Sequence, residues 1–337
     1  MKKKDWERRI QPDQSQRLRL IVQTVFLALN LWIGAQFYFF VRYFEQGGAR
    51  FDRPPGVEGW LPIAGMMNTF FYLRTGTMPE IHPAAMVLFL TFLALSLAFR
   101  KSFCGWLCPI GTISERLWKI GRQTFRRVFF PPKWIDIPLR GLKYILFGLF
   151  LWAVGGMSAA GIEAFLASPY GLVADVKMLD FFRRMSPFAA TVVGLLVIGS
   201  FFVPNFWCRY LCPYGALMGL ASLASPLRIR RVPDLCIDCN KCAKACPANL
   251  PVDKLIQVRS AECIGCMECV AECPAEGALY LARPKAHPVH VRALAAAMLA
   301  LFAVAVTTAK VTGHWHSPIP DHVYEQLIPM AADFQHP

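Results

Sequence analysis

Five runs of apolar residues, each about as long as a membrane-spanning helix, occur along this sequence. They cover residues 20–41, 81–99, 144–160, 188–206 and 289–309. A helix needs about 20 mostly apolar residues to cross a bilayer, within a range of roughly 17–25. The chain as a whole is 55% hydrophobic and only 17% charged, which is too apolar for an ordinary soluble domain. We therefore expect a mainly α-helical, polytopic membrane bundle with about five spans.

Basic residues gather in alternate loops and predict the orientation of this bundle. They crowd residues 1–19, 100–140 and 207–286, whereas residues 44–80 and 311–337 hold few. Loops rich in Lys and Arg usually face the cytoplasm, so we expect the N-terminus inside and the C-terminus outside a bacterial inner membrane. The same loops explain the net charge of +14 better than nucleic-acid binding does, and no nucleic-acid partner is expected. The basic residues of the N-terminal segment are Lys2, Lys3, Lys4, Arg8, Arg9, Arg17 and Arg19.

Eight of the twelve cysteines form one motif that occurs twice, as CIDCNKCAKACP at residues 236–247 and CIGCMECVAECP at residues 263–274. This is the spacing of bacterial two-cluster ferredoxins, in which three close cysteines bind one [4Fe–4S] cluster and the fourth, before a proline, binds the other. Zinc also uses Cys-x2-Cys pairs, but a duplicated four-cysteine run ending in Cys-Pro favours iron–sulfur clusters. The expected ligands of cluster 1 are Cys236, Cys239, Cys242 and Cys273. The expected ligands of cluster 2 are Cys263, Cys266, Cys269 and Cys246.

The other four cysteines form two Cys-x3-Cys-Pro motifs, CGWLCPIG at residues 104–111 and CRYLCPYG at residues 208–215. Each follows an apolar run, so the two motifs indicate parallel repeats with equivalent sites at one depth. Proline suits the first turn of a helix, which predicts that the second cysteine of each pair lies at a helix N-terminus, where the dipole favours a thiolate. A third iron–sulfur cluster is the leading interpretation; redox-active dithiol pairs and copper(I) are alternatives. We call Cys104, Cys108, Cys208 and Cys212 the paired-motif site.

These motifs, together with RPPGVEGWLPI at residues 53–63, resemble the NapH-type membrane polyferredoxins of periplasmic nitrate reductase systems. The wider group includes the NosR and CcoG accessory proteins, and the resemblance covers roughly residues 20–285. It implies electron transfer from membrane quinol toward a periplasmic partner, commonly a cytochrome c or a ferredoxin-type protein. NapH-type proteins resemble four-span chains that end in the cytoplasm, whereas this chain adds a fifth run and an exterior tail. That difference leaves the partner open.

Several residues outside the cysteine motifs are candidates for other chemistry. Oxidation of quinol needs a proton acceptor near the outer face, and His82 and Glu163 are candidates. The expected exterior tail is rich in histidine, which either is simply solvated or binds a metal such as copper, or a haem. The tail histidines are His314, His316, His322 and His336.

The sequence therefore predicts five segments in order. Residues 1–19 are a cytoplasmic N-terminus, 20–227 a four-span region with the paired motifs, 228–286 a small cytoplasmic two-cluster ferredoxin domain, 287–310 a fifth span and 311–337 a periplasmic tail. The expected function is iron–sulfur electron transfer between the quinol pool and periplasmic redox partners, as a subunit of a quinol dehydrogenase. The alternative is an assembly factor or copper reductase that supports a respiratory metalloenzyme. A transporter fits poorly, because no array of ionisable residues lies inside the apolar runs.

Overall fold

The structure is a computed structural model of the chain. It describes residues 7–10, 13–126, 128–284 and 287–335. Four residues used in the sequence interpretation, Lys2, Lys3, Lys4 and His336, lie outside the described residues.

The chain forms two compact units, each built from three separate segments. Unit 1 comprises Met1–Leu27, Phe92–Phe147 and Leu196–Leu301. Unit 2 comprises Ala28–Thr91, Gly148–Leu195 and Phe302–Pro337.

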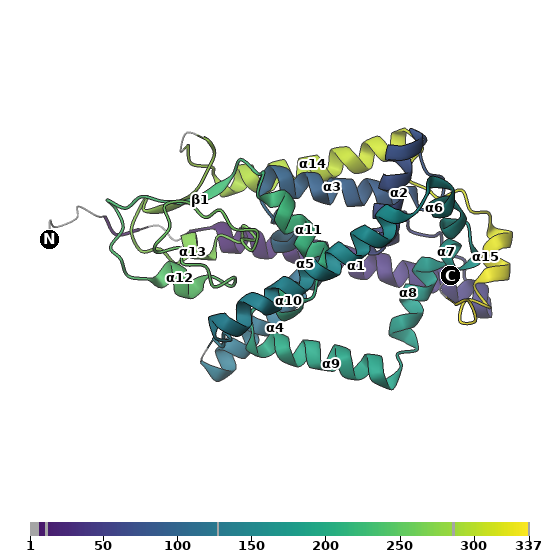
Figure 1. Cartoon of the computed structure of the whole chain (residues 1–337), viewed down its shortest axis with the longest axis horizontal. Coiled ribbons are helices and arrows are strands. Elements are labelled where there is room, and N and C mark those ends of the chain that lie inside the picture. Colours follow the sequence, from purple (N-terminus) through teal and green to yellow (C-terminus); the bar gives the residue numbers. More distant parts are fainter. Residues whose placement is uncertain (1–6, 11–12, 127, 285–286, 336–337) are drawn as a thin grey trace. The chain divides into compact units, whose positions relative to one another are not determined.

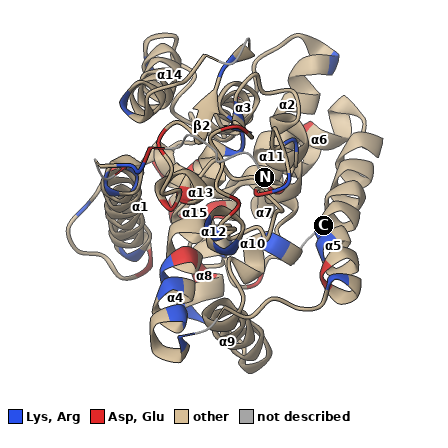
Figure 2. Cartoon of the chain, turned by 90° about the vertical axis from the view of Figure 1, so that its left-hand side faces the viewer, with Lys and Arg blue, Asp and Glu red and all other residues tan. Residues whose placement is uncertain are grey.

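The five apolar runs all fold as helices, which confirms the mainly helical fold class (Figure 1). The helices are α1 (Ser15–Gln46), α3 (Pro83–Phe99), α5 (Lys133–Gly156), α9 (Pro187–Phe202) and α14 (Val291–Val311). By length and composition α1, α5 and α14 can each cross a membrane, and α8 (Ala174–Arg183) with α9, bent by 80°, makes a fourth candidate if the pair is one span. Helix α3 is apolar throughout but has only 17 residues. The structure thus supports three or four candidate spans. Of the helices in these candidates, α9 carries no charged residue (Figure 2).

Helix α5 begins eleven residues before the apolar run that predicted it, at Lys133 rather than residue 144. Charged residues interrupt the hydrophobicity of this first part, so the run alone placed the start too late. The pair Asp136 and Arg140 lies one turn apart and forms an ion pair, and Asp136 stands in the first turn, where the helix dipole favours a carboxylate.

Unit 1 contains the short elements that carry the cysteines. They are η2 (Phe103–Leu107), α4 (Pro109–Phe125), α10 (Phe206–Tyr210), α11 (Pro213–Ser222), β1 (Arg228–Arg231), α12 (Lys241–Ala245), α13 (Glu268–Ala271) and β2 (Leu279–Ala282). Strands β1 and β2 pair antiparallel, with Arg228 opposite Ala282 and Arg231 opposite Leu279. The two strands enclose both ferredoxin-type motifs between them in the sequence, and α12 contacts α13. The segment is thereby closed into one small fold.

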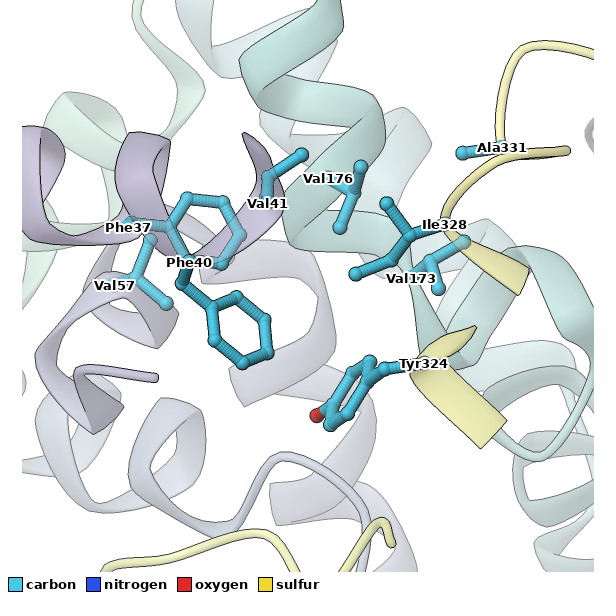
Figure 3. Close-up of a cluster of buried hydrophobic side chains, with 9 residues drawn as sticks. All are labelled: Phe37, Phe40, Val41, Val57, Val173, Val176, Tyr324, Ile328 and Ala331. Carbon is cyan, nitrogen blue, oxygen red and sulfur yellow. The ribbon is translucent and has the colours of Figure 1, made fainter. Parts of the chain in front are cut away.

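Unit 2 is built around a hydrophobic cluster that includes the C-terminal tail (Figure 3). Its remaining elements are η1 (Pro55–Trp60), α2 (Pro62–Thr75), α6 (Ala159–Leu166), α7 (Pro169–Leu172) and α15 (Asp321–Leu327). From the tail, Tyr324 and Ile328 pack with Phe40 of α1 and Val173, and all four are buried. The tail is therefore part of the packed core of this unit.

Candidate iron–sulfur centres

The paired motifs place a cysteine at the start of a helix twice, as the sequence predicted. Cys108 is the N-cap of α4 and Cys212 is the N-cap of α11, and a proline occupies the first turn of each helix. The amide of Gly215 donates a hydrogen bond to the Cys212 sulfur at 3.2 Å. A Cβ on Gly111 would lie 2.4 Å from the Cys104 carbonyl oxygen, so only glycine lets the motif turn this tightly. Both helix N-termini therefore direct backbone N–H groups toward a thiolate.

The structure brings the four thiols of the paired-motif site within electrostatic range of one another. Burial raises the pKa of Cys104 to about 11, and the Cys212 sulfur contributes to the rise. Burial likewise raises the pKa of Cys108 to about 12, with contributions from Cys104 and Cys212. The pKa of Cys208 is raised well above the ordinary value by burial and by the other three sulfurs. Cysteines crowded and buried in this way stay protonated unless a bound cationic group stabilises their thiolate forms.

The surroundings of the paired-motif site fit an anionic four-thiolate cluster. Lys101 is 3% exposed and Lys143 is fully buried, and the positive charges of both lower the pKa of Cys104. Lys143 also donates to Glu262 at 2.6 Å. Within the described residues no group of three or more His, Cys, Asp or Glu side chains is gathered tightly enough for a single metal ion. A cubane spreads its four thiolates over four irons, so its ligands lie farther apart than those of one ion.

The ferredoxin-type loops bring cysteines of one motif close to cysteines of the other. Burial raises the pKa of Cys273, and the charges of Cys239 and Cys236 raise it further. Burial raises the pKa of Cys246, and Cys263 is the sulfur that contributes most to it. The fourth cysteine of each motif thus lies beside the first cysteines of the other motif. This crossed arrangement is the one that two-cluster ferredoxins use.

The backbones of the two loops turn at equivalent positions. Asp238 and Asn240 in the first loop have φ of 55° and 59°, and Gly265 and Met267 in the second have φ of 62° and 60°. Left-handed residues are uncommon outside glycine, so their recurrence at matched positions shows that both loops adopt one conformation. A backbone that coils in this way can direct successive N–H groups inward, toward bound sulfur.

The first paired motif packs directly against the loop that carries the cluster 2 ligands. Trp106 is fully buried, and its Nε1 donates to the carbonyl oxygen of Gly265 at 3.0 Å. A Cβ on Gly105 would lie only 2.4 Å from the carbonyl oxygen of Ile264. Ile264 and Gly265 stand between Cys263 and Cys266.

Arg209, in the second paired motif, makes a similar connection. Its guanidinium is 5% exposed and donates to Asp136 at 2.9 and 2.8 Å. Its Nη1 donates to the carbonyl oxygen of Pro247, the residue after the cluster 2 ligand Cys246, at 3.0 Å. Both paired motifs are therefore tied to segments that carry the expected ligands of cluster 2.

Arg19 on α1 is a site residue that sequence reasoning missed. It was counted only as one of the basic residues of the N-terminal segment, yet it is 1% exposed. Its guanidinium pairs with Glu115 on α4 and donates to the carbonyl oxygen of Gly105 at 2.9 Å. Lys119 joins Glu115 to Glu268 of the cluster 2 loop through contacts of 2.7 Å. No local sequence signal separates this buried arginine from its exposed neighbours.

In unit 2, the structure places His82 in a buried cluster of charges. Its Nδ1 lies 3.3 Å from Glu58 and its Nε2 lies 2.9 Å from the carbonyl oxygen of Gly171. Arg53 pairs with Glu58 at 2.9 Å and with Asp175 at 2.7 Å. Burial alone would lower the pKa of His82, but the hydrogen bond and the charge of Glu58 outweigh it and raise the pKa. These acceptors favour the imidazolium form, which has no free lone pair.

The other candidates lie at more open positions. Glu163 is exposed on α6. In the tail, His314 is half-buried, and His316 and His322 are exposed. His316 lines a cavity of about 110 Å3 beside Arg53. The structure does not gather the described tail histidines into a metal-binding group.

The sequence of this chain is similar to two families of iron–sulfur domains and to several membrane electron-transfer proteins. A family described as "4Fe-4S binding domain" matches residues 81–127 and 185–231, which contain the two paired motifs. A second family, "4Fe-4S dicluster domain", matches residues 228–274. No solved structure matches the chain.

Among curated proteins, the "Putative electron transport protein YccM" of Escherichia coli is 46% identical over 94% of this chain and 91% of its own length. The "Regulatory protein NosR" of Pseudomonas aeruginosa is 31% identical over 56% of this chain and 26% of its own length. The "Ferredoxin-type protein NapH" of Haemophilus influenzae is 29% identical over 56% of this chain and 61% of its own length. The near full-length match to YccM, with the iron–sulfur domains on both sets of cysteines, shows that this chain belongs to the NapH- and NosR-like group of membrane [4Fe–4S] electron-transfer proteins.

Proposed function

We propose that this protein carries electrons between membrane quinol and an exterior redox partner through three [4Fe–4S] clusters. The paired-motif site would hold one cluster, and the ferredoxin-type segment would hold clusters 1 and 2. Each cluster, when bound, supplies one-electron transfer. The protein supplies the thiolates, the burial and the relative positions of the sites.

One observation carries this proposal: the packing of the paired motifs on the segments that hold cluster 2. Trp106 and Gly105 contact the loop between Cys263 and Cys266, and Arg209 binds the residue after Cys246. These contacts support a fixed order, in which electrons pass between the paired-motif site and cluster 2, and between cluster 2 and cluster 1. The crossed cysteines, Cys246 and Cys273, support the second step because each belongs to one motif and lies beside cysteines of the other motif, which links the two cluster-binding loops.

The quinol end of the route is proposed from the position of the paired motifs in the chain. Cys104 follows α3 by five residues and Cys208 follows α9 by six, so both motifs stand at the ends of apolar helices. A lipid-soluble donor or acceptor would meet such sites first. Of the two residues considered as proton acceptors, Glu163 is exposed, whereas His82 is buried against Glu58, which favours its protonated form. We propose Glu163 as the acceptor, and His82 as the alternative that must first release its own proton.

Two further parts of the proposal rest on the sequence and on the relatives. The basic loops support a cytoplasmic N-terminus and ferredoxin segment in a bacterial inner membrane, with a periplasmic tail. The similarity to NapH supports a periplasmic cytochrome c or ferredoxin-type partner.

The direct test is electron paramagnetic resonance of the intact protein, purified without oxygen. Adding a quinol to the oxidised protein should produce the signals of reduced clusters. If electrons flow the other way, adding a quinone to protein reduced beforehand with dithionite should remove those signals. A protein whose clusters respond to dithionite but to neither form of the quinone would contradict the quinol assignment, while leaving iron–sulfur electron transfer intact.

A further inference from the structure

Arg100, immediately after α3, is a buried cation without a counter-ion. Arg100 is 1% exposed, and its Nε and Nη1 have no hydrogen-bond partner. Only Nη2 is used, donating to the carbonyl oxygen of Ser260 at 3.0 Å. Across the described part of the chain no acidic side chain forms an ion pair with it. A buried charge left unpaired is strongly unfavourable, so the site calls for negative charge that the side chains do not provide.

The position of this guanidinium is fixed relative to cluster 2. The Ser260 carbonyl oxygen that accepts from Arg100 also accepts from the backbone amide of Cys263, at 3.2 Å. A Cβ on Gly265 would lie 3.7 Å from the Cβ of Arg100. The arginine thus lies along the Ser260–Gly265 loop, which carries the first ligand of cluster 2.

The backbone of Arg100 is held in a conformation that costs energy. Its φ is 66°, in the left-handed region that few residues other than glycine adopt readily. The buried hydroxyl of Ser225 accepts from the Arg100 amide at 2.9 Å and donates to the carbonyl oxygen of Ala98 at 3.1 Å. This anchoring keeps a strained residue, and its charge, in place.

Other arginines near cluster 2 are neutralised, screened or less deeply buried than Arg100. Arg19 is paired with Glu115, and Arg209 is paired with Asp136. Arg259 belongs to the same loop region as Ser260 but is exposed, so water screens its charge. Arg228, which interacts with Cys263, is only half-buried and donates to the carbonyl oxygens of Ser222 and Leu223. Arg100 is therefore the fully buried, uncompensated positive charge among these arginines.

We propose that Arg100 raises the reduction potential of cluster 2 above that of cluster 1. Reduction adds one electron to a bound cluster, and a fixed positive charge in a low-dielectric environment stabilises the added charge. Charge near a cluster is among the factors that set its potential, and the unused Nε and Nη1 show that no side chain neutralises this charge. This inference rests on the proposed function, since it requires cluster 2 to bind at Cys246, Cys263, Cys266 and Cys269.

The test is a redox titration of the intact, anaerobically purified protein, followed by electron paramagnetic resonance. Arg100→Gln removes the charge but keeps a polar, hydrogen-bonding side chain. We expect the midpoint potential of one ferredoxin-type cluster to fall by at least about 59 mV, a tenfold change for a one-electron couple, and that of the other to stay unchanged. Arg100→Lys should restore most of the potential. Arg259→Gln, the matched loss of an exposed charge, should leave both potentials unchanged.

Unchanged potentials in an Arg100→Gln protein with full iron content would overturn the inference. If that variant does not assemble, the unsubstituted protein still decides the question. A Cys263→Ser variant identifies the signal of cluster 2 as the one it alters, and that signal should be the one reduced at the higher potential. The opposite order would refute the role of Arg100. An unsubstituted protein that lacks iron at these cysteines would instead refute the proposed function.

Discussion

The contact between Gly105 and Ile264 makes Gly105→Ala a severe test of the packing around cluster 2. The new Cβ would lie 2.4 Å from the Ile264 carbonyl oxygen, whereas close C···O contacts normally begin near about 3.3 Å. One of the two segments must therefore move by roughly 1 Å. The Gly105 carbonyl oxygen also accepts from Arg19 at 2.9 Å and from Gln23 at 3.1 Å, so movement of the motif strains two buried hydrogen bonds.

Overpacking of this kind typically costs about 1–3 kcal/mol, and weakening a hydrogen bond from a charged donor can add about 1.5–3 kcal/mol. We expect Gly105→Ala to lower the apparent melting temperature in detergent, and to slow quinol-linked reduction or oxidation of clusters 1 and 2 without loss of iron. Gly148→Ala is the matched control, because Gly148 lies in α5 with nothing within 4 Å of its Cβ position. If Gly105→Ala matched Gly148→Ala in melting temperature and in electron-transfer rate, the proposed contact would not matter.

Two further predictions concern cluster number and topology. The intact protein should contain about twelve irons. A double variant, Cys104→Ser with Cys212→Ser, should retain about eight, because only the ferredoxin-type clusters would remain. Equal iron contents in both proteins would exclude a cluster at the paired-motif site. A reporter fused after Phe334 should behave as periplasmic and one fused after Ser260 as cytoplasmic, because the basic loops set the orientation; a cytoplasmic signal from both fusions would show that α14 does not span.

The cysteine spacing could be interpreted from the sequence because the ligands of an iron–sulfur cluster lie close together along the chain. The Cys-Pro pairs likewise predicted two helix N-termini, and both helices begin at the proline, Pro109 and Pro213. Helix boundaries were harder to predict from the sequence where charged residues interrupt an apolar run, as at the start of α5. Apolar runs report hydrophobicity, whereas the helix itself also depends on ion pairs such as that of Asp136 with Arg209.

The sequence could not separate buried cations from those of ordinary basic loops. Arg19 and Arg100 both contribute to the pattern that predicts orientation, yet both are about 1% exposed and pack beside cluster 2 segments. Their burial depends on contacts between residues far apart in the chain, for example Arg19 with Glu115. In unit 2, the burial of Arg53 could not be predicted from the sequence for the same reason. Arg53 forms ion pairs with Glu58, five residues later, and with Asp175, more than one hundred residues later.

The measurement that tests the central claim most directly compares Cys108→Ser with the unsubstituted protein. Cys108 belongs to the paired-motif site but to neither ligand set of the ferredoxin-type clusters. We predict that Cys108→Ser abolishes electron transfer linked to quinol, while clusters 1 and 2 assemble and remain reducible by dithionite, as seen by electron paramagnetic resonance. Electron transfer from quinol at the unsubstituted rate would show that the paired-motif site is not on the route, and would favour an assembly factor or a copper reductase.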